Sequence, residues 1–238
     1  MNFNHSFYGR GLTGVDPKEL KGALIVIEGG DGAGRSTQVG LLRNAIEKMG
    51  HPTTEIGLKR SRLVGDELTQ AMQKNVLCPR TLGLFYATDL ADQLENSVIP
   101  ALKAGFVVVA DRYIYTLIAR DIVRGADPAW IKGVYGIALI PNLIFYLKVP
   151  PRTLAEHALQ KNGVLNYWES GMDIQRSGDM HECFIYYQNR LWQQFNQMKE
   201  EYKINIVNGN RDEKTIHKAI FSEVKAHLES LITQKIAA

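Results

Sequence analysis

A glycine-rich stretch directly after a short apolar segment is the feature that most restricts how this chain can fold. The apolar segment, residues 23–27 (ALIVI), is typical of a strand buried on both faces. Residues 29–37 (GGDGAGRST) follow it, and the pattern beyond them predicts a helix over about 36–49. Small residues let successive backbone N–H groups turn inward around phosphate oxygens, and the helix N-terminus favours the same anion. We therefore expect a strand, a phosphate-binding loop and a helix.

The loop has the spacing G-x-x-x-x-G-K-[ST] except at one position, where Arg35 replaces the lysine. Arginine keeps the positive charge and can bind phosphate bidentately, but it is a bulky planar fork where lysine is a point charge. Ser36 lies where the hydroxyl group of such loops holds Mg²⁺. The loop predicts phosphate binding and leaves open whether turnover with Arg35 is normal.

Apolar runs and helical periods alternate along the rest of the chain. Further strands are expected at 53–57, 106–110, 143–147 and 204–207, and further helices at 80–104, at 179–202 and from 214 onward. This alternation predicts a parallel sheet covered on both faces, whose ligands sit beyond the carboxyl ends of its strands. Residues 1–20 are expected to form an extension that packs on this body through Phe3, Phe7 and Tyr8.

The composition excludes several classes of protein. The 238 residues are 45% apolar and 22% charged, as in ordinary globular domains, so neither disorder nor a fibrous repeat is expected. A net charge of +3 without a Lys/Arg block argues against a nucleic acid polymer as partner. No apolar run reaches the roughly 18 residues of a membrane span. Cys78 and Cys183 lack metal-ligand spacing, which fits a reducing, cytoplasmic location.

A second motif, Asp111-Arg112-Tyr113, ends the expected strand at 106–110. In a parallel sheet, the Asp111 carboxylate would face the phosphate-binding loop, where it could hold a water on Mg²⁺ or orient a second phosphate. Arg112 could clamp that phosphate with two parallel hydrogen bonds. The alternative is a surface ion pair of little energetic weight.

These two motifs, in this order, resemble the thymidylate kinase family of nucleoside monophosphate kinases. The resemblance extends from about residue 22 to the C-terminus, and the following segments carry it: 28–34 (EGGDGAG), 84–87 (LFYA), 98–102 (VIPAL), 111–115 (DRYIY) and 165–169 (LNYWE). It implies the α/β, three-layer P-loop NTPase fold, with a five-stranded parallel sheet, helices on both faces and a helical lid. The kinase domain would span 21–238, with the lid at about 157–179.

The resemblance also implies an activity, which is transfer of the ATP γ-phosphoryl group to a nucleoside monophosphate, dTMP or a related nucleotide. ATP and Mg²⁺ would be the cofactors, and the family is commonly homodimeric. The catalytic residues carried over are Asp31, Arg35, Asp111 and Arg112, and Ser36 and Asp111 would hold the metal. The ATP-binding residues carried over are Gly29, Gly30, Asp31, Gly32, Ala33, Gly34, Arg35, Ser36 and Thr37, with Arg211 after the last strand.

The expected acceptor site departs from the family at several positions. The family's base-stacking aromatic residue falls on Tyr86, but its second phosphate-binding arginine falls on Leu90. Either Arg120 or the basic loop after the second strand, with Lys59, Arg60 and Arg62, is expected to replace it, unless that loop is merely solvated. The residues that read thymine in the family fall on Arg120 and Asp121. The lid offers Lys161 and Arg176 but no arginine pair. The substrate-binding set is therefore expected to be Tyr86, Arg112, Arg120, Asp121 and Arg60.

These departures leave two other functions open. An ionised Asp121 accepts hydrogen bonds from amino groups, which favours cytosine or guanine over thymine and hence a kinase for another small acceptor. Arg35, Leu90 and the lid without an arginine pair instead favour a nucleotide-binding module with little turnover.

Overall fold

The computed structural model describes residues 5–74, 77–174 and 179–236. Five parallel strands form one sheet in the order β2-β3-β1-β4-β5. The strands are β1 (Ala23–Gly29), β2 (Thr53–Gly57), β3 (Val107–Asp111), β4 (Leu143–Lys148) and β5 (Asn205–Asn208). Each expected strand is present within two residues at either end, and the expected parallel α/β fold is confirmed.

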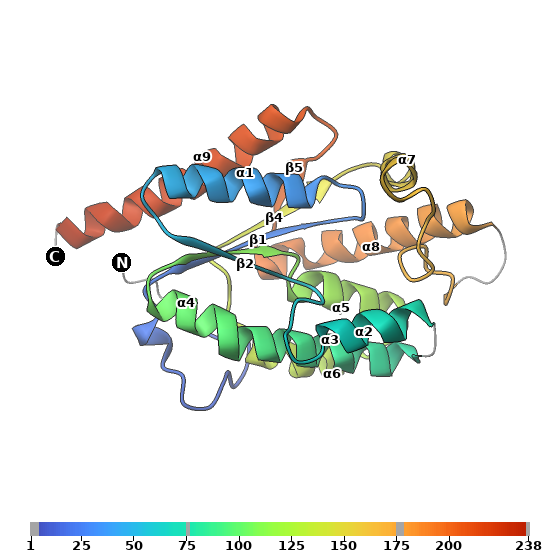
Figure 1. Cartoon of the computed structure of the whole chain (residues 1–238), viewed down its shortest axis with the longest axis horizontal. Coiled ribbons are helices and arrows are strands. Elements are labelled where there is room, and N and C mark those ends of the chain that lie inside the picture. The colour runs from blue at the N-terminus through green and yellow to red at the C-terminus, as the bar shows by residue number, and fades with distance from the viewer. Residues whose placement is uncertain (1–4, 75–76, 175–178, 237–238) are drawn as a thin grey trace.

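Helices cover both faces of the sheet (Figure 1). On one face lie α1 (Arg35–Lys48) and α9 (Glu213–Ile236). On the other face lie α3 (Pro79–Gln93), α5 (Ile114–Val123) and α8 (Met180–Tyr202), with α2 (Gly65–Gln73), α4 (Ile99–Lys103) and α6 (Pro128–Val134) around them. The helix α7 (Pro151–Asn162) follows β4 and lies at the edge where the strands end.

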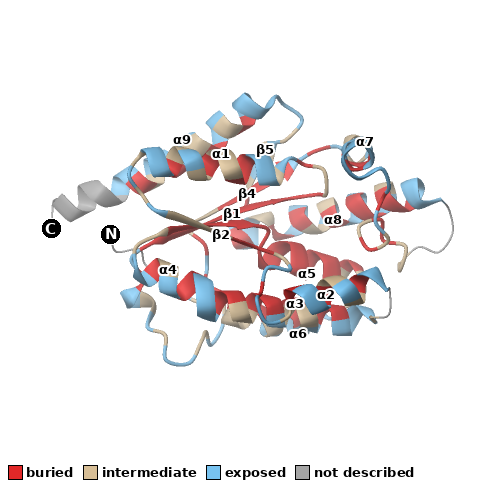
Figure 2. Ribbon diagram, in the orientation of Figure 1, coloured by how far each residue is buried: buried red, intermediate tan, exposed pale blue. Residues whose placement is uncertain are grey.

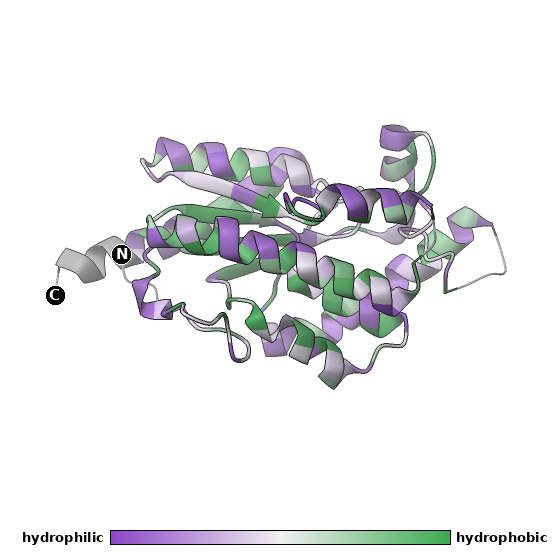
Figure 3. Ribbon diagram, turned by 60° about the horizontal axis from the view of Figure 1, so that its bottom comes forward, coloured by the Kyte–Doolittle hydropathy of each residue, from purple (hydrophilic) through white to green (hydrophobic). Residues whose placement is uncertain are grey.

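The two faces of the central strand carry separate apolar clusters. Leu24 and Val26 pack toward α3, α5 and α8, whereas Ala23, Ile25 and Ile27 pack toward α1 and α9. All seven residues of β1 are buried (Figure 2), which is why the segment reads as a continuous apolar run. Figure 3 shows the same concentration of hydrophobic residues in the central strands.

The expected long helix at 80–104 is divided. It consists of α3, a π-helical turn at Leu94–Val98, and α4, which carries Pro100 in its first turn. A proline has no N–H to donate to the preceding turn, so the wider π turn accommodates it without ending the helix.

Several helices are not anticipated by the sequence pattern, namely α2, α5, α6 and α7. In α5, nine of the ten residues are buried, the polar Thr116, Arg120 and Asp121 among them, so the helix has no exposed polar face. Of the expected lid, 157–162 belong to α7 and 163–174 form turns and irregular backbone, while 175–178, with Arg176, lie outside the described residues.

The N-terminal extension packs on the α5 side of the body. Phe7 pairs with Leu139 in an antiparallel bridge, and the hydroxyl groups of Tyr8 and Tyr115 are 2.7 Å apart. Phe7 and Tyr8 contact the core as expected, whereas Phe3 lies outside the described residues. Within the described ranges, no helix combines the length and apolar character that crossing a bilayer requires.

Two glycine positions provide a test of this packing. A Cβ on Gly22 would lie 1.9 Å from the Phe106 carbonyl oxygen, whereas one on Gly40, inside α1, would contact nothing within 4 Å. We predict that Gly22→Ala lowers the free energy of unfolding by about 1–3 kcal/mol. Gly40→Ala should raise it by about 0.5–1 kcal/mol, because alanine has less backbone entropy to lose in a helix. Urea unfolding of both variants measures this, and equal stabilities would contradict the packing described.

Candidate active site

The glycine-rich loop connects β1 to α1 at the carboxyl edge of the sheet. Gly32 and Gly34 have φ angles of +87° and +80°, in the left-handed region that favours glycine. A Cβ on Gly32 would also lie 2.8 Å from the Leu154 carbonyl oxygen, so α7 packs directly on the loop. The loop thus needs glycine both for its turn and for the contact with α7.

A pocket of about 370 Å³ lies between this loop and α7. Its wall on the loop side is formed by residues 31–37, and its opposite wall by His157, Ala158, Lys161 and Asn162, with Glu169 at one end. His157 is exposed, and its Nδ1 lies 2.9 Å from the Gly32 carbonyl oxygen. The backbone of the loop therefore lines a cavity of the size that ligand sites have.

Arg35 turns its side chain back into the loop. Its Nη1 donates to the carbonyl oxygen of Gly29 at 2.6 Å and to that of Gly30, and its Nε donates to Asp111 Oδ1 at 2.9 Å. Only 12% of the side chain is exposed. The guanidinium group thus points into the loop and binds its carbonyl groups. From its position in the motif, it was expected to point toward phosphate instead.

Ser36 and Asp111 meet across the edge of the sheet, as the register of β1 and β3 predicts. Ser36 Oγ donates to Asp111 Oδ2 at 2.9 Å. Burial alone would raise the pKa of Asp111, but the charge of Arg35 and the hydrogen bonds to it hold that pKa below the usual value. Two adjacent oxygen donors, one of them an ionised carboxylate, fit Mg²⁺, which commonly takes one or two protein ligands besides phosphate and water.

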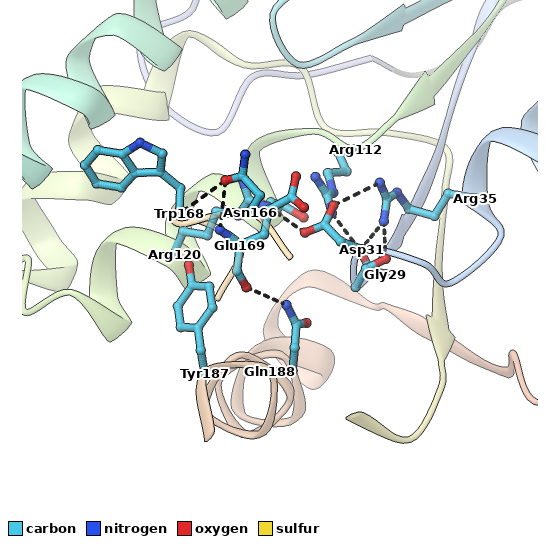
Figure 4. A network of polar contacts seen from close by, with 12 residues as sticks. Gly29, Asp31, Arg35, Arg112, Arg120, Asn166, Trp168, Glu169, Tyr187 and Gln188 are labelled. Carbon is cyan, nitrogen blue, oxygen red and sulfur yellow. Dashed lines mark hydrogen bonds and ion pairs between the residues drawn. The ribbon is translucent and has the colours of Figure 1, made fainter. Parts of the chain in front are cut away.

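Asp31 lies among three guanidinium groups (Figure 4). Its carboxylate oxygens are 2.5 Å from Arg112 Nη2, 3.2 Å from Arg120 Nη2 and 3.9 Å from Arg35 Nη2. Burial would raise the pKa of Asp31, but these three positive charges outweigh it and hold the pKa far below its usual value. Arg35 is four residues from Asp31 in the chain, whereas Arg112 and Arg120 are more than 80 residues away and meet it only at the edge of the sheet.

Two of the arginines at this site have N–H groups that remain available for further hydrogen bonds. Among the described residues, Arg112 Nε and Arg120 Nε are buried and have no hydrogen-bond partner. Buried N–H groups without an acceptor are costly, so a site with two of them is suited to an anionic ligand.

Glu28 holds the second motif in place. This fully buried carboxylate is the last but one residue of β1 and accepts hydrogen bonds from the backbone N–H groups of Tyr113 and Thr116 and from the Thr116 hydroxyl group. It therefore anchors the first turn of α5, and Arg112, two residues before that helix, has a left-handed φ of +71°. The role of Glu28 was not predicted, although an acidic residue near the end of an otherwise apolar strand is a recognisable signal.

The expected acceptor side is closed. A void of only about 10 Å³ lies among Met72, Tyr86, Arg120, Asp121, Arg124 and Trp168. A second void of about 10 Å³ lies between the loop, Arg112 and Arg120. Each has room for no more than about one water molecule. Tyr86, Arg120 and Asp121 are thus brought together as expected, but without space for a base.

Asp121 is a buried carboxyl group with unmet hydrogen bonding. Its Oδ2 has no partner among the described residues, and a Cβ on Gly83 would lie 2.8 Å from this oxygen. Burial raises the pKa of Asp121 to about 6, despite the opposing charges of Arg124 and Arg120.

Not every expected residue joins this group. Arg60 forms an ion pair with Glu55 and keeps 44% of its side chain exposed, and Arg211 is exposed in the turn after β5. Lys59 is the member of that basic loop that the cluster influences, because burial and the charge of Arg120 lower its pKa. Leu90, 3% exposed, belongs to the core.

Glu169 is a further acidic group that the sequence analysis did not single out. Burial and the charge of Asp31 raise its pKa, and its carbonyl oxygen accepts a 3.3 Å hydrogen bond from Gln188 on α8. Glu169 belongs to the segment 165–169, on which the family resemblance partly rests. That membership was the only feature of the sequence that pointed to this residue.

Comparison with known proteins shows the family of this chain. The model of the thymidylate kinase family matches residues 27–220. The chain is 37% identical over 198 residues to the probable thymidylate kinase 2 of Saccharolobus solfataricus, covering 83% of this chain and 92% of that protein. It is 29% identical over 217 residues to the probable thymidylate kinase of Thermococcus kodakarensis, with 86% and 98% covered. The thymidylate kinase of Fervidobacterium nodosum is 26% identical over 216 residues, with 86% and 100% covered. The chain therefore belongs to the thymidylate kinase family and is an ATP-dependent nucleoside monophosphate kinase.

Proposed function

We propose that this kinase transfers the γ-phosphoryl group of ATP to dTMP at the carboxyl edge of the sheet. ATP would lie with its phosphates in the glycine-rich loop, and the acceptor phosphate at Arg112 and Arg120. The observation that carries this assignment is the pair of buried Nε–H groups of these two arginines, which lack acceptors beside the loop. Catalysis of this kind consists of positioning and charge stabilisation, with no covalent intermediate.

On the donor side, backbone amides of residues 29–34 would bind the phosphates, and the N-terminus of α1 would favour their charge. Arg35 would exchange its bonds to the Gly29 and Gly30 carbonyl oxygens for bonds to phosphate oxygens. Phosphate binds guanidinium more strongly than a neutral carbonyl group does, so this exchange is favourable. Thr37 and Arg211 would contact the nucleotide further out.

Ser36 and Asp111 would hold Mg²⁺, through the oxygen atoms that lie 2.9 Å apart. The ion would neutralise charge on the phosphate oxygens during transfer. Arg35, whose Nε contacts the other oxygen of Asp111, would leave that carboxylate when it turns to phosphate. The same side-chain movement thus opens the loop and frees the metal ligand.

On the acceptor side, Arg120 would take the place of the family's second phosphate-binding arginine. A buried phosphate carries nearly two negative charges, and Arg112 alone would leave it poorly compensated. Asp31 now neutralises both arginines, and the acceptor phosphate would compete with it. Tyr86 and Asp121 would contact the base, and a protonated Asp121 can donate to a carbonyl oxygen such as those of thymine. The homodimer and the cytoplasmic location stay predictions.

Formation of ADP from ATP and Mg²⁺ with a panel of nucleoside monophosphates tests the proposed reaction. We expect ADP with dTMP at a rate well above that without acceptor. Turnover only with a cytosine or guanine nucleotide would contradict dTMP as the acceptor. ATP binding by calorimetry without turnover of any acceptor would instead support a binding module.

Kinetics can decide whether Arg120 or Arg60 replaces the family's second phosphate-binding arginine. We predict that Arg120→Ala raises the KM for dTMP at least about tenfold, because a charged hydrogen bond to phosphate is lost. Arg60→Ala should change it by less than about twofold, because an exposed ion pair contributes little. Steady-state kinetics of both variants measure this. A large effect of Arg60→Ala with none of Arg120→Ala would move the phosphate contact to the loop after β2.

Asp121 makes stability depend on pH in a definable window. Its pKa is raised from 3.8 to about 6 by folding, so the folded state binds the proton more tightly than the unfolded state does. Its contribution to stability is present below pH 3.8 and is lost as the pH rises through about 6. We predict that the free energy of unfolding, relative to Asp121→Asn, falls by about 1–3 kcal/mol across this window. Urea unfolding of both proteins across this pH range measures the difference. If their free energies of unfolding change with pH in the same way, Asp121 does not titrate in this window.

A further inference from the structure

The buried side chain of Arg124, at the end of α5, uses all five of its N–H groups. Its Nε and Nη2 donate to the two carboxylate oxygens of Asp173 at 2.7 and 3.2 Å. Nη2 also donates to the Trp168 carbonyl oxygen at 3.1 Å, and Nη1 donates to the Tyr187 hydroxyl group at 2.5 Å and the Arg120 carbonyl oxygen at 3.5 Å. A guanidinium group with 4% of its side chain exposed thus connects α5, α8 and the segment 166–173.

The segment 166–173 has no helix or strand of its own. Its backbone hydrogen bonds are local, such as those from Ser170 to Asn166 and from Met172 to Tyr167. Besides the contacts of Arg124, hydrogen bonds to the body run from Trp168 Nε1 to the Met72 carbonyl oxygen and from the Gln188 side chain to the Glu169 carbonyl oxygen. The polar contacts of this segment with the body are therefore few, and those with Arg124 are the most numerous, while Trp168 and Tyr167 add apolar packing.

Trp168 links Arg124 to the expected acceptor side. The indole is 5% exposed, lies under the Arg124 guanidinium group at 5.9 Å, and borders the void of about 10 Å³ beside Tyr86. The other walls of this void come from α2, α3 and α5, and Trp168 packs in the same apolar cluster as they do. A base can enter only if a wall moves, and the wall formed by Trp168 is the one that belongs to neither a helix nor a strand.

We propose that Arg124 is a positioning residue that holds Trp168 in the space the acceptor base needs, so that the acceptor binds by displacing this indole. The inference rests on the proposed function, because it takes the void beside Tyr86 as the base site. Binding then requires the fraction of molecules in which the segment 166–173 is released, and the apparent dissociation constant rises as that fraction falls. We call the contacts of Arg124 with Asp173 and Trp168 the latch. If the segment were instead an ordinary lid that closes on a bound acceptor, weakening the latch would raise the apparent dissociation constant of the acceptor.

The substitution Asp173→Asn weakens the latch without changing the size of the side chain. We expect the Kd for dTMP, measured by calorimetry, to fall by about three- to tenfold, with the Kd for ATP unchanged. Glu201→Gln, which removes the exposed ion pair with Lys132, is the matched control and should alter neither constant. A higher or unchanged Kd for dTMP in Asp173→Asn would overturn the proposal.

A spectroscopic measurement tests the same point without any acceptor. In a Trp130→Phe/Trp192→Phe background, Trp168 is the sole tryptophan. Acrylamide should quench it several-fold more strongly after Asp173→Asn, and dTMP added to the background protein should produce a similar increase. Equal quenching with and without Asp173→Asn overturns the latch even if dTMP is not the substrate. Absence of ADP formation, with the quenching as expected, would instead remove the proposed function and leave the latch. If the double variant does not fold, as judged by circular dichroism, Arg124→Lys in the natural chain provides the same comparison through the Kd.

Discussion

The pairing of Asp31 with three guanidinium groups is the interaction on which the site depends. Arg35, Arg112 and Arg120 come from α1, the end of β3 and the end of α5, and each would be expensive to bury alone. One carboxylate between them makes the concentration of positive charge compatible with a folded state that contains no ligand. It also makes the arrangement exchangeable, because a phosphate group carries more negative charge than Asp31 and can replace it as the partner of the same arginines.

The arginine that replaces lysine in the loop makes contacts that a lysine would not make. Lysine would present one point charge, whereas Arg35 reaches two loop carbonyl groups, Asp111 and the vicinity of Asp31 together. Its fork thus binds two carbonyl groups of the loop and the Asp111 carboxylate in one conformation. On the other side of the arginines, Trp168 and the small voids leave no space for a base. The two sides therefore differ: the loop borders a pocket of about 370 Å³, whereas the side of Trp168 holds voids of only about 10 Å³.

Much of the fold was predictable because it follows from local patterns. The strand at 23–27, the glycine spacing after it and the motif at 111–113 each depend on neighbouring residues, and parallel pairing then places them at one edge. Helix α5 was not predicted because its polar residues are buried along with its apolar ones, and α7 because most of its residues are polar. The choice between Lys59 and Arg60 was not predictable, since it depends on which side chain finds Glu55 on β2.

The amino-acid sequence alone therefore determined the α/β class, the phosphate-binding loop, the family and the residues that meet at the sheet edge. These properties reside in spacing along the chain, which the backbone converts directly into geometry. Only the tertiary structure decided which charges pair, that Glu28 anchors α5, that Arg35 turns into its own loop and that Arg124 fixes Trp168 over the acceptor side. Apart from the bonds of Arg35 to its own loop, such contacts join segments tens of residues apart, and their formation depends on burial, which no local pattern encodes.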